Sequence, residues 1–135
     1  MGGGQVRVIT RRGDDSRIRS YRDLRVWQEG MRLAENCYGL TKAFPKAELF
    51  GMTSQIRRAA SSVPANIAEG YGRDSKGDYI QFLRISQGSL KEVETHLILC
   101  TRVMLLTESE AQSILEHCDL LGKMLHRLIR SLQGV

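Results

Sequence analysis

Polar side chains repeat at helical spacing in two stretches of the chain, where they could act together. The first stretch contains Gln55, Arg58, Ser62, Asn66 and Glu69. The second contains Ser86, Ser89 and Glu92. Such stripes predict either a polar pocket or contact strip, or a hydrogen-bond network between two helices, because buried polar groups need partners. We favour a structural network, whose predicted members are Gln55, Asn66, Glu69, Ser89 and Glu92.

The sequence contains no motif for catalysis or metal binding. Di-iron helical bundles place a Glu three residues before a His on two helices. The residues three before the histidines at 96, 117 and 126 are Val93, Ile114 and Lys123. Residues 116–118 read Glu-His-Cys, and consecutive helical residues point in different directions. Neither a nucleophile elbow nor a phosphate-binding Walker loop occurs. We therefore predict no enzymatic activity, no cofactor and no metal.

Arg57, Arg58 and Arg73 are the predicted contacts to nucleic-acid phosphates in the folded part. The net charge is +5, but residues 1–22 hold six arginines against two aspartates and so carry +4. Residues 23–135 hold 14 basic and 13 acidic side chains, which leaves this part almost neutral. The alternative to nucleic-acid binding is therefore that these arginines lie on an ordinary solvated face. A symmetric ring would favour nucleic-acid binding, because it would gather the charges of several copies on one rim.

The cysteines and the hydropathy pattern indicate a cytoplasmic protein. Cys37, Cys100 and Cys118 are odd in number, widely spaced and set in apolar stretches. This pattern is typical of buried free thiols in a reducing compartment. No apolar run approaches the roughly 18 residues of a membrane span, and the N-terminus lacks the apolar core of a signal peptide.

Four amphipathic helices must position these side chains. They are predicted over residues 23–43, 47–71 and 76–106, with a fourth opened by the capping box of Thr107 and Glu110. Short connections predict an all-α, antiparallel up-down four-helix bundle. Pro64 falls within the second helix and predicts a kink there. We expect this bundle over residues 21–135, preceded by a flexible basic arm over residues 1–20.

The apolar residues exceed what a small bundle interior needs. The first helix has a predicted core stripe of Leu24, Trp27, Met31, Ala34 and Tyr38. The predicted stripe of the second begins at Met52. Further apolar residues flank the stripes of the third and fourth helices: Ile98, Leu99, Leu105, Leu106, Leu115, Leu120 and Ile129. Part of this surface should meet another chain, so the sequence predicts a homo-oligomer. Gly30 and Gly88 predict close approaches between helices.

Four segments of the sequence resemble a known bacterial family. They are residues 23–28 (DLRVWQ), 55–60 (QIRRAA), 62–70 (SVPANIAEG) and 88–95 (GSLKEVET). Together they resemble the four-helix-bundle family named after the protein encoded in 23S rRNA intervening sequences. Its relatives include the accessory variability determinants of diversity-generating retroelements. The resemblance covers about residues 21–132.

The resemblance implies a non-catalytic bundle that assembles into a ring, with homopentamers as the usual form. In the retroelement relatives it implies binding of nucleic acid, RNA or DNA, and of a reverse transcriptase. This chain is more similar to the intervening-sequence branch, whose biochemical function is largely unassigned. The sequence therefore predicts a homo-oligomeric scaffold associated with nucleic acid. The alternative is a protein–protein interaction module without nucleic-acid affinity.

Overall fold

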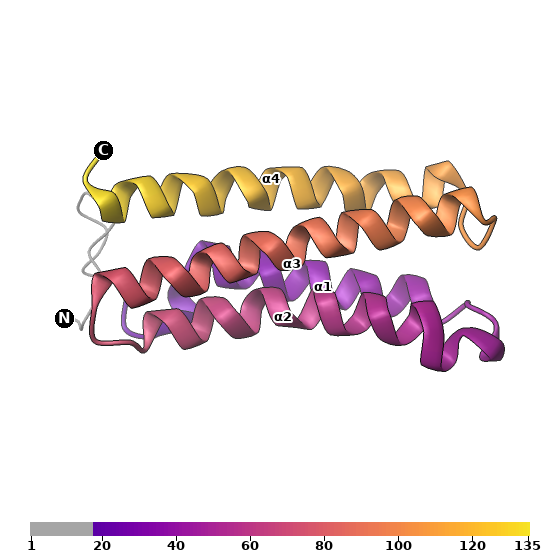
Figure 1. Ribbon diagram of the computed structural model, residues 1–135, viewed down its shortest axis with the longest axis horizontal. Helices are drawn as coiled ribbons and strands as arrows, with labels where there is room; N and C mark the ends of the chain where they lie inside the picture. The colour runs from indigo at the N-terminus through magenta and orange to yellow at the C-terminus, as the bar shows by residue number, and fades with distance from the viewer. Residues whose placement is uncertain (1–17) are drawn as a thin grey trace.

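The computed structural model describes residues 18–135, and these residues fold into a four-helix bundle. The helices are α1 (Arg25–Thr41), α2 (Ser54–Tyr71), α3 (Lys76–Arg102) and α4 (Glu108–Gln133). Successive helices run in opposite directions, and α4 also packs against α1, which closes the bundle (Figure 1). The all-α up-down bundle predicted from the sequence is confirmed. Most of the predicted arm lies outside the described residues.

The described structure begins three residues before the predicted bundle boundary. Ile18 packs against the core, and Ser20 caps a short 3-10 turn, η2 (Tyr21–Asp23). The Asp23 carboxylate accepts hydrogen bonds from the backbone N–H groups of Arg19 (2.8 Å) and Ser20 (3.2 Å). These bonds attach residues 18–20 to the start of the bundle.

Side-chain caps define the starts of α3 and α4, as the sequence indicated. The Ser75 hydroxyl accepts from the Asp78 backbone N–H at 3.0 Å. The capping box before α4 is complete, because Thr107 Oγ1 accepts from the Glu110 N–H at 3.0 Å and Glu110 accepts from the Thr107 N–H at 2.8 Å. Each bond satisfies a backbone donor that the first helical turn leaves without a partner.

The segment before α2 is less regular than predicted. A 3-10 turn, η3 (Lys46–Glu48), and a π-helical turn, η4 (Leu49–Thr53), precede the α-helix, which begins at Ser54 rather than at residue 47. Gly51 has φ −107° and ψ −114°, outside the helical range. From Ser54 onward α2 is one helix across Pro64, and the kink there stays a prediction. A Cβ on Gly30 would lie 3.4 Å from the Pro64 Cβ, which confirms the close contact predicted at Gly30.

The inward face of α1 differs from the predicted stripe. The buried residues of this helix are Val26, Gly30, Leu33, Ala34, Cys37 and Thr41. Met31 and Tyr38 are 36% and 44% exposed, and Trp27 is only partly buried, so this part of the prediction was wrong. Smaller side chains occupy the inward face because α1 approaches Pro64 of α2 closely at Gly30. The bulky side chains consequently lie beside α2 on the outside of the bundle.

The surplus apolar residues of α3 and α4 divide between the interior and the surface. Leu106 and Ile129 are buried in the core, and Leu105 and Leu115 pack partly against it. Ile98, Leu99 and Leu120 are 43%, 46% and 50% exposed. A reduced apolar surplus therefore remains on the outside of α3 and α4. Among the described residues, no helix is both long and apolar enough to span a membrane.

Candidate functional site

A short chain of polar side chains joins α2 to α3 near the middle of the bundle. The hydroxyls of Ser62 and Ser89 are hydrogen-bonded at 2.8 Å. The Asn66 amide donates to the Ser62 carbonyl (2.8 Å) and hydroxyl (2.9 Å). One turn away, the buried Ser86 hydroxyl donates to the Val63 carbonyl at 2.8 Å. The structure therefore places Asn66 and Ser89 in one interhelical network that passes through Ser62.

The other predicted members of the network lie outside it. Gln55, Glu69 and Glu92 are exposed, and the Glu69 carboxylate accepts instead from the Arg73 guanidinium at 2.9 Å. Gly88 is also exposed, and a Cβ placed on it would have no atom within 4 Å. The prediction that Gly88 permits a close approach between helices was therefore wrong.

The three predicted phosphate contacts do not form one cluster. Arg57 is partly buried and holds α1, because its Nε donates to Thr41 Oγ1 at 2.9 Å and its guanidinium lies 4.5 Å from the centre of the Tyr38 ring. Arg58 is exposed and donates to the Ser54 hydroxyl at 3.2 Å. Arg73 lies at the other end of α2, about 24 Å away along the helix axis.

Arg57 and Arg58 lie beside exposed aromatic rings. A hollow of about 400 Å³ opens where η4 meets α2, and we call it the Phe50 hollow. Its lining residues are Tyr38, Leu49, Phe50, Thr53, Ser54, Arg57, Arg58 and Ser61. Phe50 is 93% exposed, which is unusual for a large apolar side chain. Two guanidinium groups and two accessible rings therefore share one end of the bundle.

An apolar groove runs between α1 and α2 next to the Phe50 hollow. This α1–α2 groove has a volume of about 630 Å³. Its lining residues are Tyr21, Trp27, Met31, Ala34, Glu35, Tyr38, Gly39, Lys42, Ser61, Pro64, Ala65 and Ala68. Small side chains of α2 form its floor, and Trp27, Met31 and Tyr38 supply the larger side chains. Tyr38 and Ser61 line both depressions, so the apolar surface is continuous.

The comparisons with known proteins identify the family. The family model of the 23S rRNA-intervening sequence protein matches residues 22–127. The chain belongs to this family. This chain is similar to the crystal structure of a protein of unknown function from the S23 ribosomal protein family of Bacteroides thetaiotaomicron VPI-5482, with a TM-score of 0.70 and 27% identity. The match covers 78% of this chain and 98% of the other. No curated protein matches the sequence.

The three cysteines are buried in the bundle, and His117 contacts a carboxylate on another helix. All three cysteines are buried and free, and burial raises the pKa values of Cys37 and Cys118 to about 12. At neutral pH these thiols are protonated and poor nucleophiles. His117 Nε2 lies 2.8 Å from Glu29 Oε1. Within residues 18–135, no group of three or more His, Cys, Asp or Glu side chains could hold a metal ion.

Phe50 is the most exposed aromatic residue among residues 18–135, and the sequence did not single it out. Phe50 does not belong to the apolar stripe predicted from Met52 onward. This was the one sign in the sequence that its side chain points away from the core. For Trp27 and Tyr38 the sequence offered no such signal, because they continue a regular 3-4 apolar pattern. Their outward position follows from the contact between Gly30 and Pro64, which joins residues distant in sequence.

Proposed function

We propose that this protein is a non-enzymatic cytoplasmic scaffold that assembles with copies of itself, as a pentamer, and associates with nucleic acid. The observation that carries the proposal is the continuous apolar surface of the α1–α2 groove and the Phe50 hollow. Exposed apolar side chains that gather along a groove often mark an interaction site. Membership of the family supports the same conclusion.

The occupant of the α1–α2 groove in this proposal is a second copy of the chain. Ile98, Leu99 and Leu120 are exposed apolar residues on the other helix pair, α3 and α4. Exposed apolar residues on two different faces of one chain suit a head-to-tail contact, which repeats around a closed ring. A single self-complementary patch would instead favour a dimer.

Light scattering on the full chain tests this assembly. We expect a mass about five times that of the 15.2 kDa chain at micromolar concentration. Met31→Lys should lower the mass, because it places a charge in the groove where a second copy would desolvate it. Gln112→Lys adds the same charge on an exposed part of α4 and should leave the mass unchanged. A 15 kDa particle for the unaltered chain would overturn the proposal.

The nucleic-acid part of the proposal is supported by the Phe50 hollow. Exposed aromatic rings can stack on unpaired bases, while arginine side chains contact the phosphates that connect them. Phe50 supplies the exposed ring and Arg58 an exposed guanidinium. Arg57 is a weaker candidate than the sequence suggested, since Thr41 and Tyr38 already hold it.

RNA retention at low salt tests the nucleic-acid part. The full chain should slow single-stranded RNA in a gel at about 50 mM salt, and binding should weaken as salt rises. Phe50→Ala and Arg58→Gln should each weaken binding by about fivefold or more. Arg102→Gln removes an exposed charge at the α3 terminus and is the matched control. Unchanged RNA mobility would favour the alternative, a module that binds only proteins.

A pull-down after nuclease treatment tests that alternative. A protein partner, such as a reverse transcriptase or another enzyme, should stay bound when RNA and DNA are digested. Loss of the partner on digestion would contradict a direct protein contact and support the nucleic-acid association. The pull-down uses the unaltered chain. A parallel pull-down with Phe50→Ala shows whether the protein partner binds at the Phe50 hollow.

A further inference from the structure

The charged side chains of α4 have opposite signs in its two halves. The first half, residues 108–119, contains no lysine or arginine, and its acidic residues are Glu108, Glu110, Glu116 and Asp119. The second half contains no acidic residue, and its basic residues are Lys123, Arg127 and Arg130, with His126. Leu120 lies at the middle of the helix, where the sign of the charge changes.

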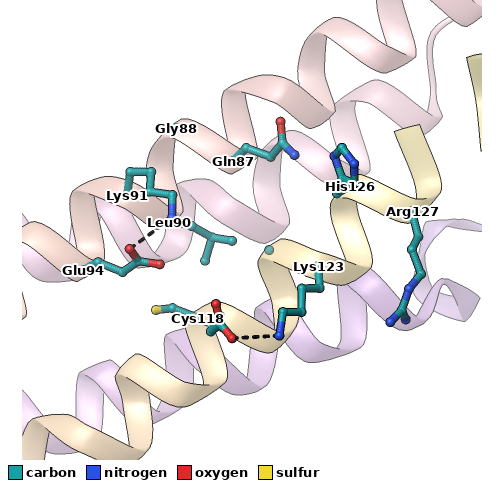
Figure 2. A pocket seen from close by; sticks show the side chains of 11 residues that line it. Gln87, Gly88, Leu90, Lys91, Glu94, Cys118, Lys123, His126 and Arg127 are labelled. Carbon is teal, nitrogen blue, oxygen red and sulfur yellow. Dashed lines mark hydrogen bonds and ion pairs between the residues drawn. The ribbon is translucent and has the colours of Figure 1, made fainter. Parts of the chain in front are cut away.

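Four residues form one outward face of this helix, which we call the α4 outer face: Glu116, Leu120, Lys123 and Arg127. They follow 4-3-4 spacing, so their side chains leave the helix in similar directions. All four are exposed, and Leu120 is 50% exposed. In Figure 2, which views the groove between α3 and α4, Lys123 and Arg127 point away from α3. The α4 outer face is therefore open to another molecule.

The helix dipole explains only the charges at the two ends of α4. It favours acidic side chains in the first turn and basic ones in the last, and its effect falls off beyond those turns. Glu108 and Glu110 lie in the first turn, and Arg130 lies in the last. Glu116 and Lys123 lie well inside the helix. The dipole therefore does not account for the order of charges on the α4 outer face.

Contacts within the chain leave the charges of this face available. Lys123 lies 3.2 Å from Asp119, but the two side chains are 66% and 71% exposed, so water screens the pair. Glu116 accepts a hydrogen bond from the uncharged Gln112 amide at 3.0 Å. Within residues 18–135, neither Glu116 nor Arg127 forms an ion pair. A second surface can therefore pair with these charges.

The α4 outer face is complementary to itself when one copy is turned around. In an antiparallel arrangement about Leu120, the acidic half of each α4 faces the basic half of the other. Glu116 of one copy then lies between Lys123 and Arg127 of the second copy, and the two Leu120 side chains meet at the centre. A parallel arrangement would instead place like charges opposite each other, which is unfavourable.

We propose that the α4 outer face binds the same face of a second copy in antiparallel orientation, across a two-fold axis near Leu120. This contact goes beyond the proposed ring, because it uses neither the α1–α2 groove nor the Phe50 hollow. Ile98 and Leu99 belong to α3 and take no part in it. Two single helices bury less than the roughly 1,200 Å² of a stable interface, so we expect a Kd of about 0.1 mM. The pair is therefore scarce at the micromolar concentrations that serve to measure the ring.

Cross-linking at the centre of the face tests the contact. In Leu120→Cys, a short bismaleimide should link two copies at about 0.1 mM protein and about 20 mM salt. The product on a denaturing gel should have about twice the mass of the 15.2 kDa chain. The yield should fall at least about threefold at roughly 500 mM salt, because salt screens exposed charges. The native cysteines are all buried, so the chain without the substitution is the blank.

Ser109→Cys tests the antiparallel orientation. Ser109 is exposed and lies on the same side of α4 as Leu120, about 16 Å away along the axis. In the antiparallel pair the two copies of this position are about 33 Å apart, so they should not be linked. No linked product from Leu120→Cys, or equal yields from the two variants, would overturn the proposal.

Charge reversal in the Leu120→Cys background tests the pairing of the two halves. Lys123→Glu with Arg127→Glu makes the face wholly acidic, and Glu116→Lys with Asp119→Lys makes it wholly basic. Each double change should lower the yield by about tenfold, and a mixture of the two proteins should restore it. Because these residues are exposed, helix content should stay the same. An unchanged yield in either protein, or no recovery in the mixture, would overturn the pairing.

Met31→Lys separates this contact from the ring. It places a charge in the α1–α2 groove and leaves α4 unaltered. Linkage through Leu120→Cys should persist in this variant, even though its mass in light scattering falls. Loss of the linkage in Met31→Lys would contradict a contact that forms independently of the ring. Linkage in a chain that proves monomeric at micromolar concentration would support the α4 contact and overturn only the ring.

Discussion

Glu29 and His117 join α1 to α4 through a contact of 2.8 Å between Oε1 and Nε2. Their side chains are only 15% and 14% exposed, so water screens the interaction little. The hydrogen bond from His117 is the main reason that the pKa of Glu29 lies below 4.5, and the nearby charge of Arg32 lowers it further. This contact gives α4, which otherwise packs mainly on α3, a specific attachment to α1.

The lowered pKa of Glu29 predicts how stability depends on pH. A carboxyl group whose pKa is lower in the folded state stabilises the fold above its unfolded pKa, near 4.5, and this contribution disappears as pH falls through the folded pKa. Glu29→Gln should therefore lower the unfolding free energy by about 1–3 kcal/mol at pH 7 and flatten its decline below pH 4.5. Urea unfolding at several pH values measures both effects.

Glu92→Gln provides the control for the pH experiment. Glu92 is exposed, and its side chain makes no hydrogen bond within residues 18–135. Its replacement should change the unfolding free energy by less than about 0.5 kcal/mol at every pH. Equal pH profiles for Glu29→Gln and the unaltered chain would contradict the assigned role of the Glu29–His117 contact.

Tyr79 presents the opposite case, a buried polar group without a partner. Its side chain is 4% exposed, and its hydroxyl has no hydrogen-bond partner among the described residues. The ring packs edge-on against Tyr71 with a centroid distance of 6.0 Å. Burial raises the pKa of Tyr79 well above its ordinary value, so the phenol remains neutral.

Tyr79→Phe should stabilise the protein, because the ring contacts remain and the unsatisfied hydroxyl disappears. A buried hydroxyl without a partner costs about 1–3 kcal/mol, and we expect a gain of about 1 kcal/mol. Denaturant unfolding gives the value, and Tyr38→Phe, at a 44% exposed position, should have almost no effect. A loss of more than about 1 kcal/mol for Tyr79→Phe would show that the hydroxyl has a partner in solution.

At the scale of helices, the connection from α3 to α4 contains a strained residue. Met104 has φ +69°, in the left-handed region that favours glycine, and its side chain is 87% exposed. This conformation ends α3 and lets the Leu105 N–H donate back to the Cys100 carbonyl at 2.8 Å. The helix consequently stops at Arg102, although its apolar pattern predicted continuation to residue 106.

Met104→Gly should stabilise the bundle, since glycine adopts positive φ without steric cost. The left-handed conformation costs an ordinary residue about 1 kcal/mol, which exceeds the extra entropy of an unfolded glycine. Thermal unfolding should shift upward by about 2–4 °C for a chain of this length. Val103→Gly at the neighbouring position, where φ is −97°, should destabilise instead. A lower melting temperature for Met104→Gly would contradict the conclusion that the positive φ of Met104 destabilises the folded chain.

The helices could be predicted from sequence to the extent that their signals are local. The caps at Ser75 and Thr107 depend on residues three positions apart, and both were found. The inward face of α1 could not be predicted, because two apolar faces compete along the same helix. The contact between Gly30 and Pro64 selects the face with smaller side chains, and this contact joins two distant segments. Gln55 and Glu92 were predicted as members of the network but are exposed, because the rotation of each helix about its axis depends on packing between distant segments.

At the scale of the whole molecule, charge is a weaker guide to function than apolar surface. Most of the net charge of +5 belongs to residues 1–22. In the folded part, Arg57 holds α1 and Arg73 pairs with Glu69, so neither is an uncommitted cation. The large exposed apolar residues instead lie on both helix pairs: Met31, Tyr38, Leu49 and Phe50 on one side, and Ile98, Leu99 and Leu120 on the other.

This distribution predicts that folding and assembly are coupled. If a second copy covers the α1–α2 groove, association stabilises the folded chain by mass action, so the melting temperature must rise with protein concentration. Between about 1 and 100 μM we expect an increase of several degrees, measured by calorimetry. Met31→Lys should remove most of this dependence, because the charge weakens association, while its melting temperature at the lowest concentration should match that of the unaltered chain. A melting temperature independent of concentration in both proteins would show that the apolar surface does not mediate self-association, and would leave a different protein as its partner.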